Sequence, residues 1–395
     1  MSKNVSPSFR LLLTALLLTI IYSVFSPATT NLATPQPIKT NLATPQPINW
    51  KIVIAPQFDD ADSFSEGLAK VGIGKSFVDN TYDFQDVDNY GYIDLTGKIV
   101  IPLQFKQAGD FSSGLAWIGI DSDRDGIVER YGYIDKTGKP VIKPQFEDTG
   151  NFSSGLAPVK IDNKWGYINK QGKIMIFPQF DSASEFAQGL AVVGKETKDT
   201  DYPYQQKYGY INQKGELVLP FKFSLAYNFS EDLAAAESES SKNKGYINRQ
   251  GKFIINRPDF DTFVSGNFSS GLAVVELNEG ACSAANYCDY SYIDKTGDVV
   301  IKSPENDVDF TGAQSFSEGL AAVATSGGGR DAGGWYPATN WGYLDKNGKF
   351  VISPQFDDAG SFAEGLAPVK IEGKYGYISL GARILRDNRT YPLTK

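Results

Sequence analysis

The residues best suited to chemistry in this 395-residue sequence are carboxylates, and their densest group is the segment DSDRDGIVE at 121–129. Asp121, Asp123 and Asp125 stand at alternate positions, so their carboxylates can converge on one hard cation. The backbone carbonyl of Ile127 and the carboxylate of Glu129 can add further oxygen ligands. The segment therefore predicts a structural Ca²⁺ site, and the alternative is a solvated acidic turn, since Asp and Gly also favour turns.

The spacing of this segment is similar to the first nine positions of an EF-hand loop, and more closely to the calcium-binding hairpin loops of integrin-type repeats. It departs from the EF-hand at the twelfth position, where Gly132 stands in place of the bidentate glutamate. No helical pattern flanks it, so we expect the ion to pin a long hairpin loop rather than to drive catalysis.

Two other segments have residues that could react or bind. Cys282 and Cys288 are the two cysteines of the chain, and in an exported protein we expect them to form a disulfide within one loop. A reduced pair is the alternative. Trp335 and Tyr336 follow a glycine-rich stretch that lacks a phosphate-loop ending, and with Trp117 they could contact a protein or a sugar.

Carboxylates also recur as adjacent pairs, at Asp59/Asp60 and Asp357/Asp358. Such residues could form an acid and base pair for glycoside hydrolysis, but no second carboxylate can be shown to converge on either. Because both pairs occupy the same turn of a repeat, we expect them to be structural.

Composition excludes several classes of function. The chain contains no histidine, which removes Ser–His–Asp catalysis and histidine-ligated metals, and two cysteines are too few for a four-cysteine zinc site. Thirty-eight Lys and Arg against 46 Asp and Glu give a net charge of −8, which argues against an electrostatic grip on nucleic acid. We therefore expect a protein that is not an enzyme and does not bind nucleic acid.

The N-terminus predicts export. Lys3 and Arg10 precede an apolar run at 11–25, which is the length of a signal-peptide core and shorter than most spanning helices. Residues 1–28 are thus predicted to be a signal peptide, or else a short membrane anchor that would be the one contact with a membrane. Residues 29–49 follow as a linker in which TNLATPQPI occurs twice.

The remaining residues, 50–395, consist of one unit repeated eight times. A tetrapeptide of the type GYI[DN] and a hexapeptide F-x-x-GLA alternate along the chain, with a GK-apolar-PQF segment between them. From the GYI glycine to the next GLA glycine there are 23 residues in five of seven cases, whereas the return distance ranges from 11 to 24. Length variation is therefore concentrated in one tolerant connection per unit.

Each unit is predicted to be a three-stranded β-meander, with a short fourth strand before F-x-x-GLA. GLAPVKI and WGYIN alternate apolar and polar residues, and glycine-containing turns such as KQGK precede a third strand such as KIMIFPQF. A lone meander cannot cover its apolar face, so the units must stack on one another. We expect the Tyr, Phe and Trp that recur once per unit to form the core.

These motifs resemble the WG-repeat (KWG-repeat) family of bacterial proteins. Lys164-Trp165-Gly166-Tyr167 and Asn340-Trp341-Gly342-Tyr343 carry the name-giving dipeptide, and tyrosine replaces the tryptophan in most other units. The resemblance covers residues 50–395. It implies a β-rich array, often exported, that is used for interactions and has no shared catalytic residues.

The predicted fold is an all-β tandem array of about eight three-stranded meanders, open and twisted like a solenoid, with a closed β-propeller as the alternative. The open form is favoured because the chain has one more third strand than it has units. The predicted function is a non-catalytic module of the periplasm or cell surface that binds a protein partner through its variable hairpin loops. The alternative is an envelope carbohydrate-binding or glycan-active protein.

Overall fold

The computed structural model describes residues 49–74, 89–121, 127–197, 206–239, 242–258, 266–277, 289–302, 310–326 and 339–381. Every regular element in these ranges is a β-strand. In the described part of the chain, no helix is long and apolar enough to cross a bilayer. The predicted signal peptide, residues 1–28, and the predicted linker, residues 29–49, lie outside it except for Asn49, and both stay predictions.

The strands form seven antiparallel sheets that follow the repeats, and the strand order within each sheet follows the chain with one exception. The first sheets are β2 (Asp60–Ala61), β3 (Leu68–Ile73), β4 (Asn89–Asp94) and β5 (Ile99–Phe105); β6 (Gln107–Ala108), β7 (Leu115–Ile120), β8 (Arg130–Asp135) and β9 (Pro140–Phe146); and β10 (Asp148–Thr149), β11 (Leu156–Ile161), β12 (Lys164–Asn169) and β13 (Ile174–Phe180).

The next sheet joins two repeats, and the last three complete the chain. The joined sheet contains β14 (Ser182–Ala183), β15 (Leu190–Glu196), β16 (Gln206–Asn212), β17 (Leu217–Ala226), β18 (Ala234–Ser238), β19 (Lys244–Ile247) and β20 (Phe253–Asn256). The next two sheets are β21 (Ala273–Leu277), β22 (Asp289–Ile293) and β23 (Val299–Ile301), and then β24 (Phe310–Ala313), β25 (Leu320–Ser326), β26 (Thr339–Asp345) and β27 (Phe350–Phe356). The last sheet contains β28 (Asp358–Ala359), β29 (Leu366–Ile371) and β30 (Lys374–Leu380) together with β1 (Trp50–Phe58).

The predicted repeat unit is confirmed, including its short extra strand. In the third repeat β10, β11, β12 and β13 pair in that order. The hairpin between β11 and β12 has two loop residues, Asp162 and Asn163, both with positive φ (49° and 59°), which is the backbone that a tight hairpin turn requires. The side chain of Asn169 accepts hydrogen bonds from the backbone N–H groups of Gln171 and Lys173 and so fixes the turn before β13.

The glycine of the GYI motif allows the third strand to approach. A Cβ atom on Gly166 would lie 2.5 Å from the backbone oxygen of Ile176, so no other residue fits without moving β13. Ser291 takes this position in the sixth repeat, where it is buried, and the third strand there, β23, spans three residues instead of the usual seven. The replacement of glycine by Ser291 thus coincides with a shorter pairing between β22 and β23.

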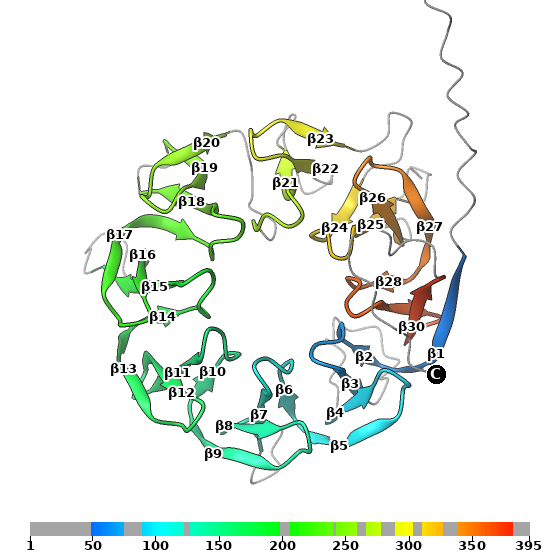
Figure 1. Cartoon of the computed structure of the whole chain (residues 1–395), viewed down its shortest axis with the longest axis horizontal. Coiled ribbons are helices and arrows are strands. Elements are labelled where there is room, and N and C mark those ends of the chain that lie inside the picture. Colours follow the sequence, from blue (N-terminus) through cyan, green and yellow to red (C-terminus); the bar gives the residue numbers. More distant parts are fainter. Residues whose placement is uncertain are drawn as a thin grey trace, which may run out of the picture. The chain divides into compact units, whose positions relative to one another are not determined.

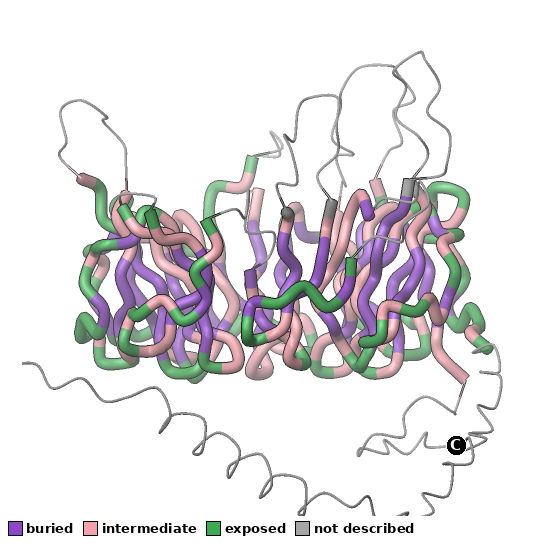
Figure 2. Tube along the Cα trace, turned by 90° about the horizontal axis from the view of Figure 1, so that it is seen from above, coloured by how far each residue is buried: buried purple, intermediate pink, exposed green. Residues whose placement is uncertain are grey.

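The core lies between neighbouring sheets. One cluster contains Leu115, Tyr133 and Ile142 from the second repeat and Phe152 and Val159 from the third. The predicted core role of the recurrent Tyr and Phe residues is confirmed, because the eight GYI tyrosines are fully buried and each of the first seven repeats packs on the next in the same way. The recurrent tryptophans Trp165 and Trp341 are half-buried and pack at the edge of these clusters. Figure 2 shows the buried residues along the middle of the strands, with exposed residues toward both ends.

The two ends of the array meet. Strand β1 pairs with β30, so residues from the start of the described chain form the outer strand of the last sheet (Figure 1). The Tyr377 hydroxyl donates to the backbone oxygen of Asp62 at 2.8 Å, and Phe64 packs against Tyr377 with ring centroids 5.0 Å apart. Contacts between the last sheet and the first are therefore of the same kind as those between any two neighbours.

This junction refines the expected architecture. The all-β tandem array is confirmed, and it is open in that no sheet closes on itself in the described residues. The surplus third strand, which favoured free ends, is β1, and it occupies the third-strand place of the eighth repeat. The sequence could not show this because pairing across more than 300 residues leaves no local signal. The sheets therefore lie in a ring, which is the arrangement of the closed β-propeller given above as the alternative.

Candidate functional site: a fixed face and a connection face

Each repeat has two kinds of turn at opposite ends of its strands. One end carries the F-x-x-G turn and the turn before the third strand, and we call these the framework turns. The other end carries the connection from the GLA strand to the GYI strand, which leaves and re-enters at paired residues such as Ile161 and Lys164. We call the strand ends that flank these connections the connection face.

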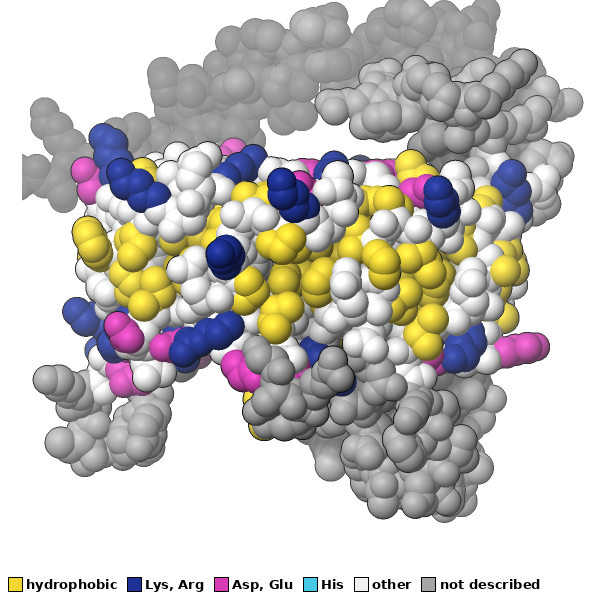
Figure 3. Space-filling model, turned by 90° about the horizontal axis from the view of Figure 1, so that it is seen from below, with side chains coloured by type: hydrophobic (Ala, Val, Ile, Leu, Met, Phe, Trp, Pro, Cys, Tyr) yellow, Lys and Arg dark blue, Asp and Glu magenta, His cyan; other side chains and the backbone are white. Residues whose placement is uncertain are grey.

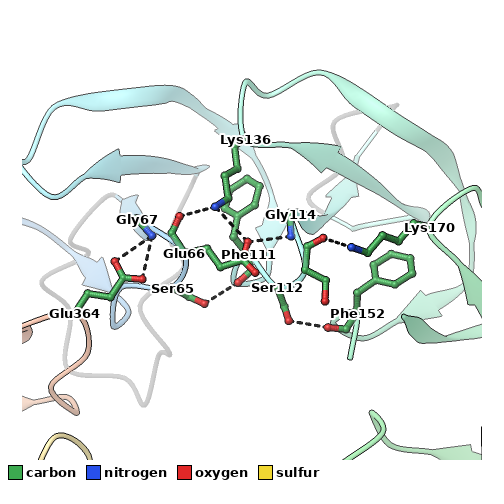
Figure 4. Close-up of polar contacts among 11 residues, drawn as sticks. Ser65, Glu66, Gly67, Phe111, Ser112, Gly114, Lys136, Phe152, Lys170 and Glu364 are labelled. Carbon is green, nitrogen blue, oxygen red and sulfur yellow. Dashed lines mark hydrogen bonds and ion pairs between the residues drawn. The ribbon is translucent and has the colours of Figure 1, made fainter. Parts of the chain in front are cut away.

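Framework turns of neighbouring repeats are bound together by side chains (Figure 4). The Ser65 hydroxyl donates to the backbone oxygen of Phe111 at 2.7 Å, and the Ser112 hydroxyl donates to that of Phe152 at 2.6 Å. The same bond recurs at four more junctions, from Ser153, Ser230, Ser269 and Ser317. Alanine replaces the serine at two junctions, as Ala187 and Ala363.

A carboxylate adds a second bond at the same junctions. Glu364 accepts from the backbone N–H of Gly67 at 3.0 and 3.1 Å, which joins the last repeat to the first. Glu66 accepts from Gly114 N–H at 2.9 Å and forms an ion pair of 3.2 Å with Lys136. Figure 4 shows these residues in one row along the turns.

The electrostatics of Glu66 follow from these partners. Partial burial opposes its ionisation, but hydrogen bonds from Gly114 and Lys136 and the charge of Lys136 outweigh that effect and lower its pKa. Burial likewise opposes ionisation of Glu231, and Lys295 and Gly271 outweigh it and lower the pKa of that carboxyl group. Both carboxylates are therefore charged at neutral pH and hold their junctions.

The residue two places before the buried phenylalanine packs against the strand that follows. Gly109 lies so close to Trp117 that a Cβ atom would be 2.0 Å from the indole nitrogen, whereas the equivalent Asp62 forms an ion pair with Lys70 at 2.8 Å. The neighbouring Asp110 is the most perturbed carboxyl group of this region. Burial and the negative charge of Asp62 raise its pKa to about 6, although Lys70 opposes the rise.

At the connection face, carboxylates hold the start of the connections. Asp59 accepts from Gly74 N–H at 3.1 Å and pairs with Lys374, and Asp357 accepts from Gly373 N–H at 2.9 Å. The second members, Asp60 and Asp358, each accept a hydrogen bond from a tyrosine of the GYI strands. These bonds are those expected of carboxylates that hold a turn of the repeat.

Length distinguishes the connections from one another. They range from two residues, 162–163, to the fifteen residues 74–88, although the strands on either side keep the same register. The strand ends Ile120 and Arg130 pair in the second repeat just as Ile161 and Lys164 pair in the third. The frame therefore does not change with the connection that it carries.

The predicted calcium site lies on one of these connections. Asp121, Ile127 and Glu129 are described, and the Glu129 N–H donates to the backbone oxygen of Ile120 at 3.1 Å, next to the last pair of the hairpin. Asp123 and Asp125 lie outside the described residues. Within the described ranges no group of three Asp, Glu, Cys or His residues could hold a metal ion. The calcium site stays a prediction.

The remaining predicted residues fall on other connections or in the frame. Cys282, Cys288, Trp335 and Tyr336 lie outside the described residues, so the disulfide and the partner contacts stay predictions. Trp117 is on β7, half-buried, with its ring 5.8 Å from that of Tyr131 in an edge-on contact. It packs against Gly109 rather than standing free, which leaves part of its surface for a partner.

Sequence reasoning missed the serine and glutamate bonds between framework turns. The signal was present, because the residue after the F-x-x-GLA phenylalanine is serine in six units and alanine in two. A serine that repeats at a turn position is readily explained by the turn itself, so its partner in the next repeat was not evident.

A family model described as WG containing repeat matches seven segments, at residues 51–75, 90–122, 131–165, 165–198, 208–239, 245–280 and 341–375. Together they cover more than half of the chain. The chain belongs to this family of WG-repeat proteins, as its motifs predict. None of the curated proteins matches the sequence.

Solved structures give weaker likenesses. One is dipeptidyl peptidase 4 of Porphyromonas gingivalis, with 12% identity and a TM-score of 0.49 over 80% of this chain and 56% of the peptidase. Another is the Dos1 propeller, with 12% identity and a TM-score of 0.45 over 85% of this chain and 96% of the propeller. A third is the β-propeller domain of the Trilobed protease from Pyrococcus furiosus, described as having an open velcro topology. It has 12% identity and a TM-score of 0.46 over 77% of this chain and 99% of that domain. The chain spans just over half the length of the first. At these values the likenesses carry no argument about function.

Proposed function

We propose that this protein is an exported, non-catalytic binding module that holds a protein partner on its connection face. One observation carries the proposal. The strand pairs that flank the connections keep one register, while the connections between them range from two to fifteen residues. A rigid frame that presents loops of differing length is the usual way in which a fold builds a specific binding surface.

The framework turns support the proposal from the other side. Their Ser, Glu and Lys side chains are occupied by bonds to the next repeat, as in Ser112 to Phe152 and Lys136 to Glu66. These side chains stabilise the ring, and a partner could engage them only by breaking those bonds. At the connection face the side-chain bonds hold the loop ends, as when Gly373 donates to Asp357, rather than one repeat to the next.

The repeat itself offers a matched variant for the test. Replacing residues 121–129 by Asp-Asn gives the second repeat the two-residue hairpin of the third, since Ile120 and Arg130 already pair as Ile161 and Lys164 do. Lys346→Gln is the control, because Lys346 is exposed on a framework turn. The full chain and both variants serve as bait in envelope extract, in calcium and in chelator.

We expect the full chain and Lys346→Gln to capture the same saturable protein and the hairpin variant to capture less of it. If the full chain also fails to capture the protein in chelator, the predicted calcium site takes part in binding. Retention of glycan alone would favour the alternative carbohydrate-binding function. Equal loss from both variants, or capture unaffected by replacing every long connection in turn, would contradict the proposal.

A further inference from the structure

The outermost strand of each repeat exposes apolar side chains to solvent. They form a band round the rim of the ring, visible in Figure 3 with basic and acidic side chains above and below it. The described members are between 36% and 75% exposed: Ile52, Val53, Ile99, Val100, Val141, Ile174, Met175, Phe177, Leu217, Val218, Ile254, Val299 and Val300. Most are β-branched residues that an edge strand favours.

Phe177 on β13 is the most exposed member of this band. It is 75% exposed, more than any other large apolar residue described. The equivalent positions of the other repeats hold Ala55, Pro102, Lys143, Pro220, Asn256, Lys302 and Ser353. The repeat therefore needs no aromatic residue there, and Phe177 enlarges the exposed apolar patch that Ile174 and Met175 form on the same strand.

The strands and turns beside Phe177 carry an excess of positive charge, although the chain as a whole is acidic. The exposed charged residues are Lys143, Lys173 and Lys214 against Glu216, and the turn that holds the last two lies on β13, where Gly215 meets Ile176. Lys143 on β9 and Lys173 before β13 are both exposed, and the structure gives neither an ion pair with a described carboxylate. In the first and second repeats the turn before the third strand begins with Asp94 and Asp135, each beside its own lysine. Asn169 takes that place in the third repeat, so this turn adds no negative charge.

Strand addition is a poor use for this edge. Pro144 and Pro178 lack the N–H group that a new strand would need, and the pairing of β12 with β13 shifts register on both sides of Tyr167. The patch also protrudes from a convex rim. Its occupant must therefore accept a projecting aromatic side chain without offering a matching backbone edge.

We propose that the rim patch of Val141, Lys143, Lys173, Ile174, Met175 and Phe177 docks onto an anionic lipid bilayer. A bilayer surface is apolar below its headgroups and negatively charged at them, which complements both features of the patch. Phe177 and Met175 enter the headgroup boundary, and the two lysines lie against the lipid phosphates. This surface is separate from the connection face and does not depend on the function proposed for it.

The test places a reporter at the patch and at its equivalent elsewhere on the ring. Phe177→Trp and Ser353→Trp are made in the full chain, and tryptophan emission is followed on phosphatidylglycerol and phosphatidylcholine vesicles with and without brominated acyl chains. The five tryptophans of the chain emit in every variant, so the emission of the unsubstituted chain under the same conditions is subtracted. Position-specific reporters are needed because residues 11–25 are apolar enough to bind vesicles themselves. Ser353 is exposed at the position that corresponds to Phe177.

We expect bromine quenching and a shift to shorter wavelength for Phe177→Trp on anionic vesicles, and neither for Ser353→Trp. Adding Lys143→Gln and Lys173→Gln should raise the lipid concentration for half-maximal quenching about thirtyfold, since each lysine near an anionic surface contributes to binding. The matched pair Lys252→Gln and Lys349→Gln, exposed at the start of other outer strands, should leave it unchanged.

Several results would overturn the inference. They are equal quenching at both positions, no quenching at position 177 on vesicles that carry the protein, and no effect of the two patch lysines. An emission shift at position 177 that appears without vesicles and grows with protein concentration would assign the patch to a second copy of the chain instead.

Discussion

The two ends of each repeat follow different rules. At the framework turns a residue's type is set by the next repeat, as when Ser112 donates to Phe152 and Glu66 accepts from Gly114. At the connection face the residues that matter to the frame are the few that hold the loop ends, such as Asp59 and Asp357. Stability is therefore concentrated at one face, and the other face is free to change in length and sequence.

The largest effect should come from the glycine that lets the third strand approach. Gly166→Ala places a Cβ atom 2.5 Å from the backbone oxygen of Ile176 and should lower the free energy of unfolding by about 3 kcal/mol. Gly155→Ala is the control, since its Cβ would meet nothing within 4 Å and it costs about 1 kcal/mol through its φ of 84°. Thermal unfolding measures both, and equal effects would show that the close approach is not what the repeat requires.

Asp110 should make the frame sensitive to pH. Its pKa is raised to about 6, mainly by burial and then by Asp62, from an ordinary value near 3.8. The folded state therefore holds the proton more tightly than the unfolded state, and stability falls as pH rises from about 4 through 6.

Asp110→Asn removes this penalty. It should stabilise the protein by roughly 2–3 kcal/mol at pH 8 and by little at pH 4. Chemical unfolding at the two pH values measures the difference. A gain of the same size at both would mean that the charge of Asp110 is not the cause.

The serine bond between framework turns can be both removed and added. Ser112→Ala should destabilise the protein by about 1 kcal/mol because it removes the donor to the Phe152 backbone oxygen. Ala363→Ser, at one of the two junctions that lack the serine, should stabilise it by a similar or smaller amount. If serine at position 363 destabilises the fold, the bond is incidental to the junction rather than part of it.

The smallest effect on stability should come from the connection face. Replacing residues 121–129 by Asp-Asn should change the free energy of unfolding by less than about 1 kcal/mol, because the flanking pair of Ile120 and Arg130 is kept. Thermal unfolding in chelator tests this without calcium. A loss as large as that of Gly166→Ala would remove the distinction between the two faces.

Much of the frame could be predicted from local patterns. The alternation in GLAPVKI and the glycine of KQGK predict strands and turns that the structure contains as β11 and the turn before β13. Ser291 in place of glycine marked the repeat in which the third strand is shortest among the described sheets.

Other features depend on contacts that no local pattern contains. The pairing of Trp50 with Leu380 and the bond from Tyr377 to Asp62 join opposite ends of the chain. The exposure of Phe177 is another example, because an alternating pattern shows which face of a strand a side chain takes but not whether another sheet covers that face. The calcium and disulfide predictions depend on connections that do not repeat.

Hydrogen exchange on the complex with the captured partner tests the central claim most directly. The account predicts that binding slows exchange at the strand ends of the connection face, in peptides spanning Ile161–Lys164 and Ile120–Arg130, and leaves the framework peptides around Ser112–Leu115 unchanged. Slowed exchange confined to the framework turns would contradict it, since the partner would then occupy the face assigned to stability.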